Sequence, residues 1–383
     1  MKPKEVKGFL QQAVKQPTKT QPVHLWGPPG IGKSALPKQI TEELKIGFVD
    51  IRLAQRDPTD LRGIPAVIDD QAIWLPPPEL PTEWFCLDCQ LVLHPKNEAE
   101  KTKCSKCGGK KITDKGILFL DELTSAPPLT QATAYQLTLD RRVGEYYLPD
   151  GWYVLAAGNR IEDRAVVYRM STALANRFTH IEVDVNLGNW TDWALSNGIN
   201  ANIVAFLQWR TELLFSFNPE SSERAFPSPR SWEFGSRISN MVGMNGSFPE
   251  LLEGTIGKGA TAEYLSFLKI QDELPNLDRI FGGEDYVPKR IDLQYAMIGA
   301  LVSKADQTIM SDETVDQYPV QFERLLKWSK ALEKATSEEF SVLLVMMLVG
   351  KSVDGVGKCP SWKIWAKDHR DVMLTKRPTT KGN

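Results

Sequence analysis

The sequence predicts an α/β domain built on a parallel sheet, followed by an α-helical region. Residues 22–26 are a short apolar run that leads into a glycine-rich segment. Residues 117–120 (ILFL) are continuously apolar, which is typical of a strand buried on both faces. After about residue 188 the strand patterns give way to helical spacing. Strands alternating with helices, followed by helices alone, indicate an α/β domain joined to a helical one.

Length and composition indicate a globular protein with two or three domains. The chain has 383 residues, 42% of them hydrophobic and 25% charged. Its net charge of -2 argues against a wholesale electrostatic binder of nucleic acid. The longest apolar run, residues 340–350, is too short to span a bilayer, and the N-terminus lacks the apolar stretch of a signal peptide. We therefore expect a cytoplasmic protein.

The remaining elements follow from spacing and turn residues. The expected elements are helices over 34–45, 128–142, 202–214, 262–270 and 339–348, strands over 48–53 and 179–185, and a proline-rich loop over 54–83. Pro149-Asp150-Gly151 predicts a hairpin that joins strands 143–148 and 152–157. Thr336 and Glu339 have the spacing of a capping box before the last helix. Residues 375–383 are expected to fray.

The glycine-rich segment matches the phosphate-loop pattern G-x-x-x-x-G-K-[ST]. Its residues are Gly27, Pro28, Pro29, Gly30, Ile31, Gly32, Lys33 and Ser34. Glycines allow backbone N–H groups to turn inward around phosphates, and the following helix offers its N-terminus to the anion. Lys33 is expected to reach the β- and γ-phosphates, and the Ser34 hydroxyl to bind Mg²⁺. The alternative is a plain glycine-rich turn, which the strand before and the helix after disfavour.

Polar residues follow two of the predicted strands. Asp121 and Glu122 come directly after the buried run 117–120, at the carboxyl edge where open α/β sheets bind ligands. Asp121 is expected to hold Mg²⁺, largely through water, and Glu122 to act as the general base toward the attacking water. Asn159 follows the strand 152–157 and either orients that water or forms an ordinary Gly-Asn turn.

Taken together, GPPGIGKS, ILFLDEL, AAGNR, ALANRF and FPSPRSWE resemble the MoxR branch of the AAA+ ATPases over roughly residues 20–290. The resemblance implies that Asn159 is sensor 1 and that Arg177 is an arginine finger inserted into the neighbouring subunit's site. It also implies that Arg230 is sensor 2, reaching the γ-phosphate from the helical lid. From the residues alone, the less favoured alternative for Arg177 is a surface salt bridge, and Arg164 or Arg169 is placed to share or take over the finger's role.

The same resemblance implies an AAA+ core over 1–187, a helical lid over 188–290 and a C-terminal helical region over 291–383. The stretch from Asp57 to Pro78 resembles the helix-2 insert of the family, and residues 143–157 resemble its pre-sensor-1 hairpin. Such proteins form rings, usually hexamers, and commonly work with a von Willebrand factor A-domain partner. Trp74 either packs in a core or interface or faces a central pore.

A cysteine-rich insertion over 84–113 interrupts the core. Cys86, Cys89, Cys104 and Cys107 form two C-x-x-C pairs, and four thiolates with this spacing are typical of a closed, structural zinc site. The alternative is four reduced thiols in a loop. His94 is expected to be a surface residue and Cys359 a small packed side chain.

Three functions remain open. The first is an ATPase that uses ATP and Mg²⁺ to remodel or mature a protein partner. The second is a nucleic-acid motor or loader that grips DNA or RNA with the zinc ribbon. The third is a scaffold that binds ATP but barely hydrolyses it, which Glu122 and Arg177 disfavour.

The usual MoxR pattern lacks the cysteine insertion. From Cys86 to Lys115 the insertion has seven lysines and four acids, so its net charge is about +1 once four thiolates bind zinc. This charge decides little, and only Trp84 and Phe85 offer rings that could stack on bases. We favour a module for protein contact or ring packing over nucleic-acid binding or a purely local staple.

Overall fold

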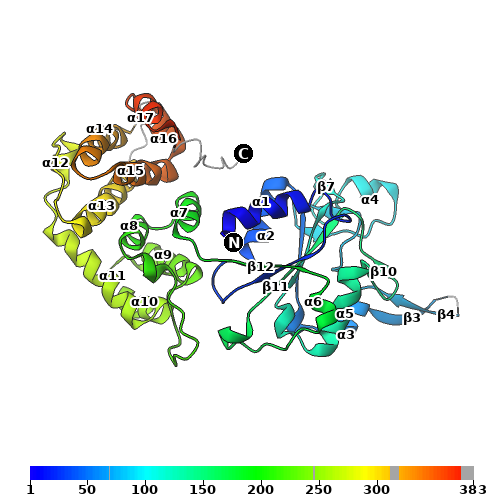
Figure 1. Ribbon diagram of the computed structural model, residues 1–383. Coiled ribbons are helices and arrows are strands. Elements are labelled where there is room, and N and C mark those ends of the chain that lie inside the picture. The colour runs from blue at the N-terminus through cyan, green and yellow to red at the C-terminus, as the bar shows by residue number, and fades with distance from the viewer. Residues whose placement is uncertain (69, 245, 311–318, 372–383) are drawn as a thin grey trace. The chain divides into compact units, whose positions relative to one another are not determined.

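The chain folds into two compact units, Met1–Val185 and Asn186–Asn383 (Figure 1). This computed structural model describes residues 1–68, 70–244, 246–310 and 319–371. The predicted frayed tail, residues 375–383, lies outside that range. None of the helices in the described residues is long and apolar enough to cross a membrane.

The first unit is built on a sheet of five parallel strands in the order β12-β1-β11-β8-β2. The strands are β1 (Val23–Trp26), β2 (Gly47–Arg52), β8 (Gly116–Asp121), β11 (Trp152–Gly158) and β12 (Thr179–Glu182). Every residue of β8 and β11 is buried, as the continuous apolar runs predict. The parallel sheet, the cysteine insertion and the helical region that follows confirm the predicted α/β core with an inserted cysteine cluster and a helical second part.

Helices cover the two faces of this sheet (Figure 1). The helices of the first unit outside the insertion are α1 (Pro3–Ala13), α2 (Ala35–Leu44), α3 (Pro58–Arg62), α5 (Pro128–Leu139) and α6 (Thr172–Ala175). Helix α2 packs against α1 and against β2 and β8. Ala134 and Leu137 of α5 join Leu118 and Leu120 of β8 in one buried core, so α5 covers the opposite face. Pro37 is accommodated because it is the third residue of α2.

Two sequence predictions for this unit are wrong. Residues 143–148 do not form a hairpin with 152–157: β9 (Arg142–Val143) pairs with β10 (Tyr146–Tyr147), and β11 pairs in parallel with β1 and β8. A strand buried along its whole length belongs in the centre of a sheet, and Gly144, at φ 57°, makes the turn of the shorter hairpin. The proline-rich stretch 54–83 contains α3 and the antiparallel pair β3 (Ile64–Ile68) and β4 (Gln71–Leu75).

The cysteine insertion folds as a small antiparallel sheet in the order β6-β5-β7. Its elements are β5 (Phe85–Cys86), β6 (Leu91–Val92), α4 (Glu98–Thr102) and β7 (Ile112–Thr113). Phe85 is buried and meets the indole of Trp152 edge-on, with ring centroids 5.7 Å apart. The Trp152 Nε1–H donates to the Thr82 carbonyl at 3.0 Å. The base of the insertion is therefore part of the core of the first unit.

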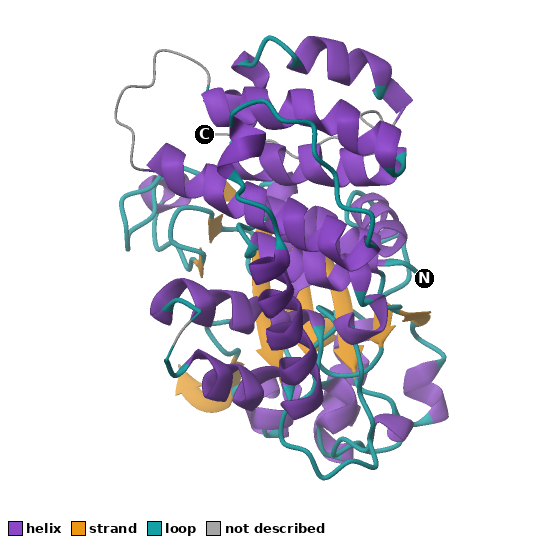
Figure 2. Ribbon diagram, turned by 90° about the vertical axis from the view of Figure 1, so that its left-hand side faces the viewer, coloured by secondary structure: helices purple, strands orange, loops and turns teal. Residues whose placement is uncertain are grey.

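The second unit is helical throughout its described residues, whereas the strands belong to the first (Figure 2). Its α-helices are α7 (Leu187–Ser196), α8 (Ala201–Trp209), α9 (Pro229–Val242), α10 (Phe248–Ile256), α11 (Lys258–Ile270), α12 (Asp278–Phe281), α13 (Ile291–Met310), α14 (Val320–Ala335), α15 (Glu338–Lys351), α16 (Val353–Lys358) and α17 (Trp362–Asp368). The predicted helix 202–214 ends at Trp209, and a 3₁₀ turn, Thr211–Leu214, follows it.

The helices after residue 290 pack directly onto those before it. Helix α13 lies along α8, and α15 contacts α7. The predicted capping box is wrong, because Ser337 is the N-cap of α15 and the Thr336 hydroxyl donates to the Leu332 carbonyl of α14 at 2.6 Å.

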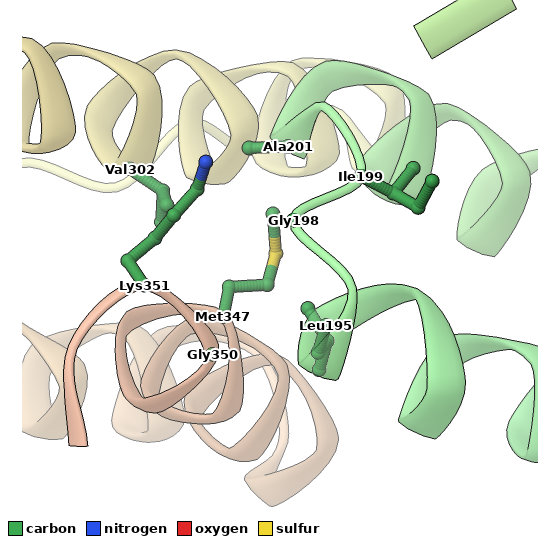
Figure 3. A pocket seen from close by; sticks show the side chains of 8 residues that line it. All are labelled: Leu195, Gly198, Ile199, Ala201, Val302, Met347, Gly350 and Lys351. Atoms are coloured by element: carbon green, nitrogen blue, oxygen red, sulfur yellow. The ribbon is translucent and has the colours of Figure 1, made fainter. Parts of the chain in front are cut away.

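A small pocket lies where α7, the α7–α8 turn, α13 and α15 meet (Figure 3). Its lining residues are Leu195, Gly198, Ile199, Ala201, Val302, Met347, Gly350 and Lys351. Gly350 allows α15 to approach α7 closely, since a Cβ at this position would stand 2.7 Å from the Leu195 carbonyl oxygen. Lys351 leaves the pocket edge to pair with Asp306 at 2.7 Å. The pocket is a small gap between packed helices of the second unit.

Candidate functional site

The phosphate loop connects β1 to α2 with the backbone conformation that an anion cradle needs. Gly30 and Gly32 adopt φ angles of 83° and 96°, which side chains other than glycine rarely tolerate. A Cβ on Gly32 would meet nothing within 4 Å, so open space lies beside the loop there. The helix α2 begins at Ala35, immediately after the loop, and the N–H groups of Ala35 and Leu36 donate to the Gly32 carbonyl at 3.1 and 3.0 Å.

Lys33 is held at the centre of the loop. Its ammonium donates to the carbonyls of Gly27 and Pro28, at 2.7 and 2.9 Å, and to Oδ1 of Asn159, at 2.9 Å. The side chain is 9% exposed. An ammonium that donates to carbonyl and amide oxygens can exchange them for a stronger, anionic acceptor such as phosphate. The contact with Asn159 joins the end of β1 to the end of β11.

Ser34 joins the loop to the carboxylate at the end of β8. Its hydroxyl donates to Oδ2 of Asp121 at 2.7 Å and makes no capping bond to α2. Asp121 is 8% exposed. A hydroxyl and a carboxylate side by side at the carboxyl edge of a sheet supply the oxygen ligands that Mg²⁺ prefers, beside the loop that would hold phosphate. The predicted pair is therefore brought together.

Glu122 lies at the bend that follows β8. It adopts a left-handed conformation, with φ 56°, and its N–H donates to Oδ1 of Asp121 at 2.9 Å. A non-glycine residue held in this region is worth inspecting as a functional position. Its side chain is half-buried.

Asp50 is a third carboxylate near this site, and sequence reasoning missed it. Partial burial, followed by the charges of Asp121 and Glu122, raises the pKa of Asp50, while Arg52 acts in the opposite direction. Arg52 stands 3.9 Å from it. The available signal was an acid placed between the apolar residues Val49 and Ile51 of β2. The three carboxylates make this edge of the sheet attractive to a divalent cation.

Contacts with Thr124 and His24 fix the segment that carries Asn159. The Thr124 hydroxyl donates to the Asn159 carbonyl at 3.1 Å. A Cβ on the preceding Gly158 would stand 2.4 Å from Oγ1 of Thr124 and 3.1 Å from the His24 ring. These contacts fix the backbone at Asn159, whose Oδ1 accepts the bond from Lys33.

Arg177 is anchored within its own subunit. Its guanidinium lies 3.6 Å from the centroid of the Tyr135 ring, and Nη1 donates to the Ala173 carbonyl at 2.6 Å. Neither contact is the salt bridge that remained open from the sequence. Arg169 is exposed, and Arg164 ends a 3₁₀ turn in a left-handed conformation.

Arg230 belongs to the second unit and is the second residue of α9. Ser228 caps this helix by accepting a bond from the Ser231 N–H at 3.1 Å, and Pro229 occupies the first turn. The Arg230 side chain is exposed there. Arg230 therefore projects from the start of a capped helix, and its role stays a prediction.

The four cysteines of the insertion converge on one point. Their sulfurs all lie within 4.8 Å of one another, with Cys86 and Cys107 3.6 Å apart and Cys89 and Cys104 3.7 Å apart. A tetrahedral ZnS₄ centre with Zn–S bonds of about 2.3 Å places its sulfurs about 3.8 Å apart, whereas a disulfide joins them at about 2.05 Å. The cluster therefore fits a four-coordinate metal ion and no disulfide.

Backbone donors support this reading. The Gly109 N–H points at Sγ of Cys107 from 3.3 Å, the kind of bond that stabilises a metal-bound thiolate. His94 faces away, with Nε2 2.9 Å from the Pro78 carbonyl oxygen, and Cys359 is buried in the second unit.

No family model matches the chain, and no curated protein matches it. Among solved structures, the RuvB Holliday junction branch migration motor of Thermotoga maritima is similar over 78% of this chain and 80% of its own, at 15% identity and a TM-score of 0.33. NtrX from Brucella abortus, in complex with ATP, is similar over 79% of this chain and 64% of its own, at 15% identity and a TM-score of 0.34. With scores this low, the chemistry of the site rests on this chain's own residues.

Proposed function

We propose that the chain is a Mg²⁺-dependent ATPase that works at the subunit interfaces of a ring and remodels a protein partner. The observation that carries the ATPase is the pair of contacts Lys33–Asn159 and Ser34–Asp121. They bring the phosphate-binding, metal-binding and sensing residues of three separate strands to one edge of the sheet. Glu122, beside Asp121, supplies the general base for the attacking water.

When bound, Mg²⁺ neutralises charge on the phosphates between which the bond breaks. Ser34 and Asp121 would hold it, Asp121 largely through water. Lys33 would give up its carbonyl acceptors for the β- and γ-phosphate oxygens. Asn159, already within hydrogen-bond distance of Lys33, would orient the water that Glu122 deprotonates.

The ring assembly and the partner rest on the sequence resemblance. In this proposal Arg177 acts in the neighbouring subunit's site, Arg230 reaches the γ-phosphate from the lid, and a von Willebrand factor A-domain protein is the partner. The structure adds one observation in favour of a protein substrate. Of the two rings of the insertion available to stack on bases, Phe85 is buried and Trp84 is half-buried with the Lys101 ammonium 5.5 Å above it.

The test is ATP hydrolysis by the purified chain and by Glu122→Gln. We expect Glu122→Gln to bind ATP with unchanged affinity and to hydrolyse it about 10²- to 10⁴-fold more slowly, because only proton transfer is lost. Glu98→Gln, an exposed carboxylate in the insertion, is the matched control and should hydrolyse ATP normally. Equal hydrolysis by Glu122→Gln and the unmodified chain would contradict the assignment.

The trapped Glu122→Gln chain with ATP also tests the partner. Co-purification of an A-domain protein that depends on ATP supports remodelling. Capture of nuclease-sensitive nucleic acid, lost when Cys104 is replaced, would favour the motor instead.

A further inference from the structure

The strand that carries the phosphate loop is tied by a side-chain link to the turn that carries Arg177. The Trp26 Nε1–H donates to Nδ1 of His180 at 2.8 Å, and the other ring nitrogen of His180 lies 2.9 Å from the Ala175 carbonyl oxygen. Trp26 immediately precedes Gly27 of the loop. Ala175 is the last residue of α6, two positions before Arg177.

The two bonds define the state of His180. An indole nitrogen only donates, so Nδ1 of His180 must accept. The ring proton then sits on Nε2 and is donated to the Ala175 carbonyl. One neutral tautomer of His180 therefore makes both hydrogen bonds at once. No other side chain of similar size accepts at the δ position and also donates at the ε position.

Aromatic rings pack against the Trp26 end of this link, whereas His180 is exposed. His24 pairs in register with His180 across β1 and β12, and its ring centroid lies 4.2 Å from that of Trp26. Phe178 meets the His24 ring edge-on at 5.6 Å, and its N–H donates to the same Ala175 carbonyl at 3.1 Å. His24 is fully buried. Movement of the indole would therefore reach the turn through the His180 ring and its two hydrogen bonds.

Nucleotide binding acts on the near end of the link. Lys33 now donates to the Gly27 carbonyl at 2.7 Å, and this bond must break when Lys33 turns to a phosphate. The carbonyl belongs to the residue that follows Trp26. The far end of the link is the turn between α6 and β12, where Arg177 is presented.

We propose that Trp26 and His180 are positioning residues that couple the state of a subunit's own phosphate loop to the placement of the arginine it offers to its neighbour. This inference rests on the proposed interface ATPase and deepens it. The link predicts that a subunit with ATP in its own site holds Arg177 differently from a subunit without it.

A mixture of two complementary chains tests the link. The acceptor chain carries Arg177→Ala and keeps Glu122; the donor chain carries Glu122→Gln, binds ATP and keeps Arg177. Each alone lacks one half of the site, so hydrolysis appears only where an acceptor's site faces a donor's arginine. His180→Gln, which can still donate to Ala175 but cannot accept from Trp26, is then placed in one chain or the other.

We expect His180→Gln in the donor chain to lower kcat of the mixture by between about twofold and thirtyfold, with KM for ATP unchanged. His180→Asn, which accepts from Trp26 but cannot reach Ala175, should have the same effect, because a link in series fails at either bond. The same changes in the acceptor chain should leave kcat unaltered. His94→Gln is the matched control, since its Nε2 also lies 2.9 Å from a backbone oxygen, that of Pro78.

Equal losses from donor and acceptor would show a general effect on folding and overturn the link. Loss from the acceptor alone, or no loss from the donor, would overturn it too. A mixture of the two parent chains that recovers no hydrolysis would overturn the interface site itself, and the link with it, so the two failures are distinguishable.

Discussion

In the proposed mechanism, Arg177 is held away from the place where it acts. In the structure its guanidinium stacks on Tyr135 at 3.6 Å and bonds to Ala173. To reach a neighbouring subunit it must leave both partners. The cation–π contact favours the stored position by about 0.5–1 kcal/mol.

We therefore expect Tyr135→Leu to raise ATP hydrolysis by about two- to fivefold, because the stored position loses that stabilisation. Steady-state rates at saturating ATP measure it. Arg177→Ala should be inactive with or without Tyr135→Leu. A rate increase that persists in the double variant would show that Tyr135 acts through something other than the arginine.

His24 gives the first unit a dependence on pH. Burial, then the neighbouring His180 and Lys33, lower its pKa from 6.5 to about 3. The native state thus prefers the neutral ring, and protons bind the unfolded chain more strongly. The stability that this ring contributes is complete above pH 6.5 and is lost as pH falls toward 3, by about 1.4 kcal/mol per pH unit.

Urea unfolding of the wild-type chain and of His24→Leu at pH 6.5 and pH 5 should reveal this dependence. Leucine cannot titrate, so the wild-type chain should lose about 2 kcal/mol more than the variant over that interval. His94→Gln, at an exposed histidine, should behave as the wild type. Parallel pH dependences of wild type and His24→Leu would show that His24 is not the group responsible.

At this scale the sequence predicted the residues whose spacing itself encodes chemistry. The phosphate loop, Asp121 and the four cysteines are contiguous or regularly spaced, and the structure brings each set together. Tyr135 and His180 were not predictable. Their importance comes from neighbours far along the chain, and nothing local distinguishes a tyrosine under an arginine from any other helical tyrosine.

Among the elements, the cysteine insertion is the one whose folding most clearly depends on a bound metal ion. Its small sheet has few buried apolar residues besides the ligands and Leu93, so bonds to the metal must replace a core. Cys86 follows Phe85, which is itself packed on Trp152. Loss of the metal should therefore loosen the base of the insertion and lower the stability of the main sheet.

We expect one zinc ion per chain as purified, none in Cys104→Ser, and a lower midpoint of thermal unfolding for that variant. Metal analysis and calorimetry provide the measurements. Cys359→Ala, at a buried cysteine of the second unit, is the control and should keep its zinc. Full zinc content in Cys104→Ser would mean that the four sulfurs are not the ligands.

Elements with an uninterrupted pattern were also the ones predicted well. Strands β8 and β11 are apolar along their length, and their existence and burial follow directly from that. The pairing of β11 did not follow from the sequence, because Pro149-Asp150-Gly151 has the residues of a hairpin turn. Instead, β11 lies in the centre of the sheet, where every one of its residues is buried. Similarly, the prolines of residues 54–83 predicted a loop, whereas β3 and β4 lie there and pair as a two-stranded ribbon outside the main sheet.

For the whole molecule, the proposed interface site makes activity a property of the assembly. A site that borrows an arginine from a neighbour is incomplete in an isolated chain, and such an arginine contributes about 10³–10⁵ in rate. We expect hydrolysis per chain to rise with protein concentration as rings form.

Titrating the chain over a wide range of concentrations while recording both mass and rate gives the measurement. Arg177→Ala should assemble but stay slow at every concentration. A rate per chain that is constant while the mass increases would place the complete site within one subunit. Lys330→Ala, at an exposed residue of α14, is a suitable control for handling.

The cysteine insertion leaves the core and returns to it at nearly the same place. Its first end is fixed by the bond from the Trp152 indole to Thr82, and at its other end Asp114 crowds Gly151, where a Cβ would stand 2.2 Å from the Asp114 carbonyl oxygen. A loop whose ends already meet adds little closure entropy however long it becomes. This position is therefore one where evolution or a protein engineer can graft a new module, provided that the graft restores the ring of Phe85 to its seat against Trp152.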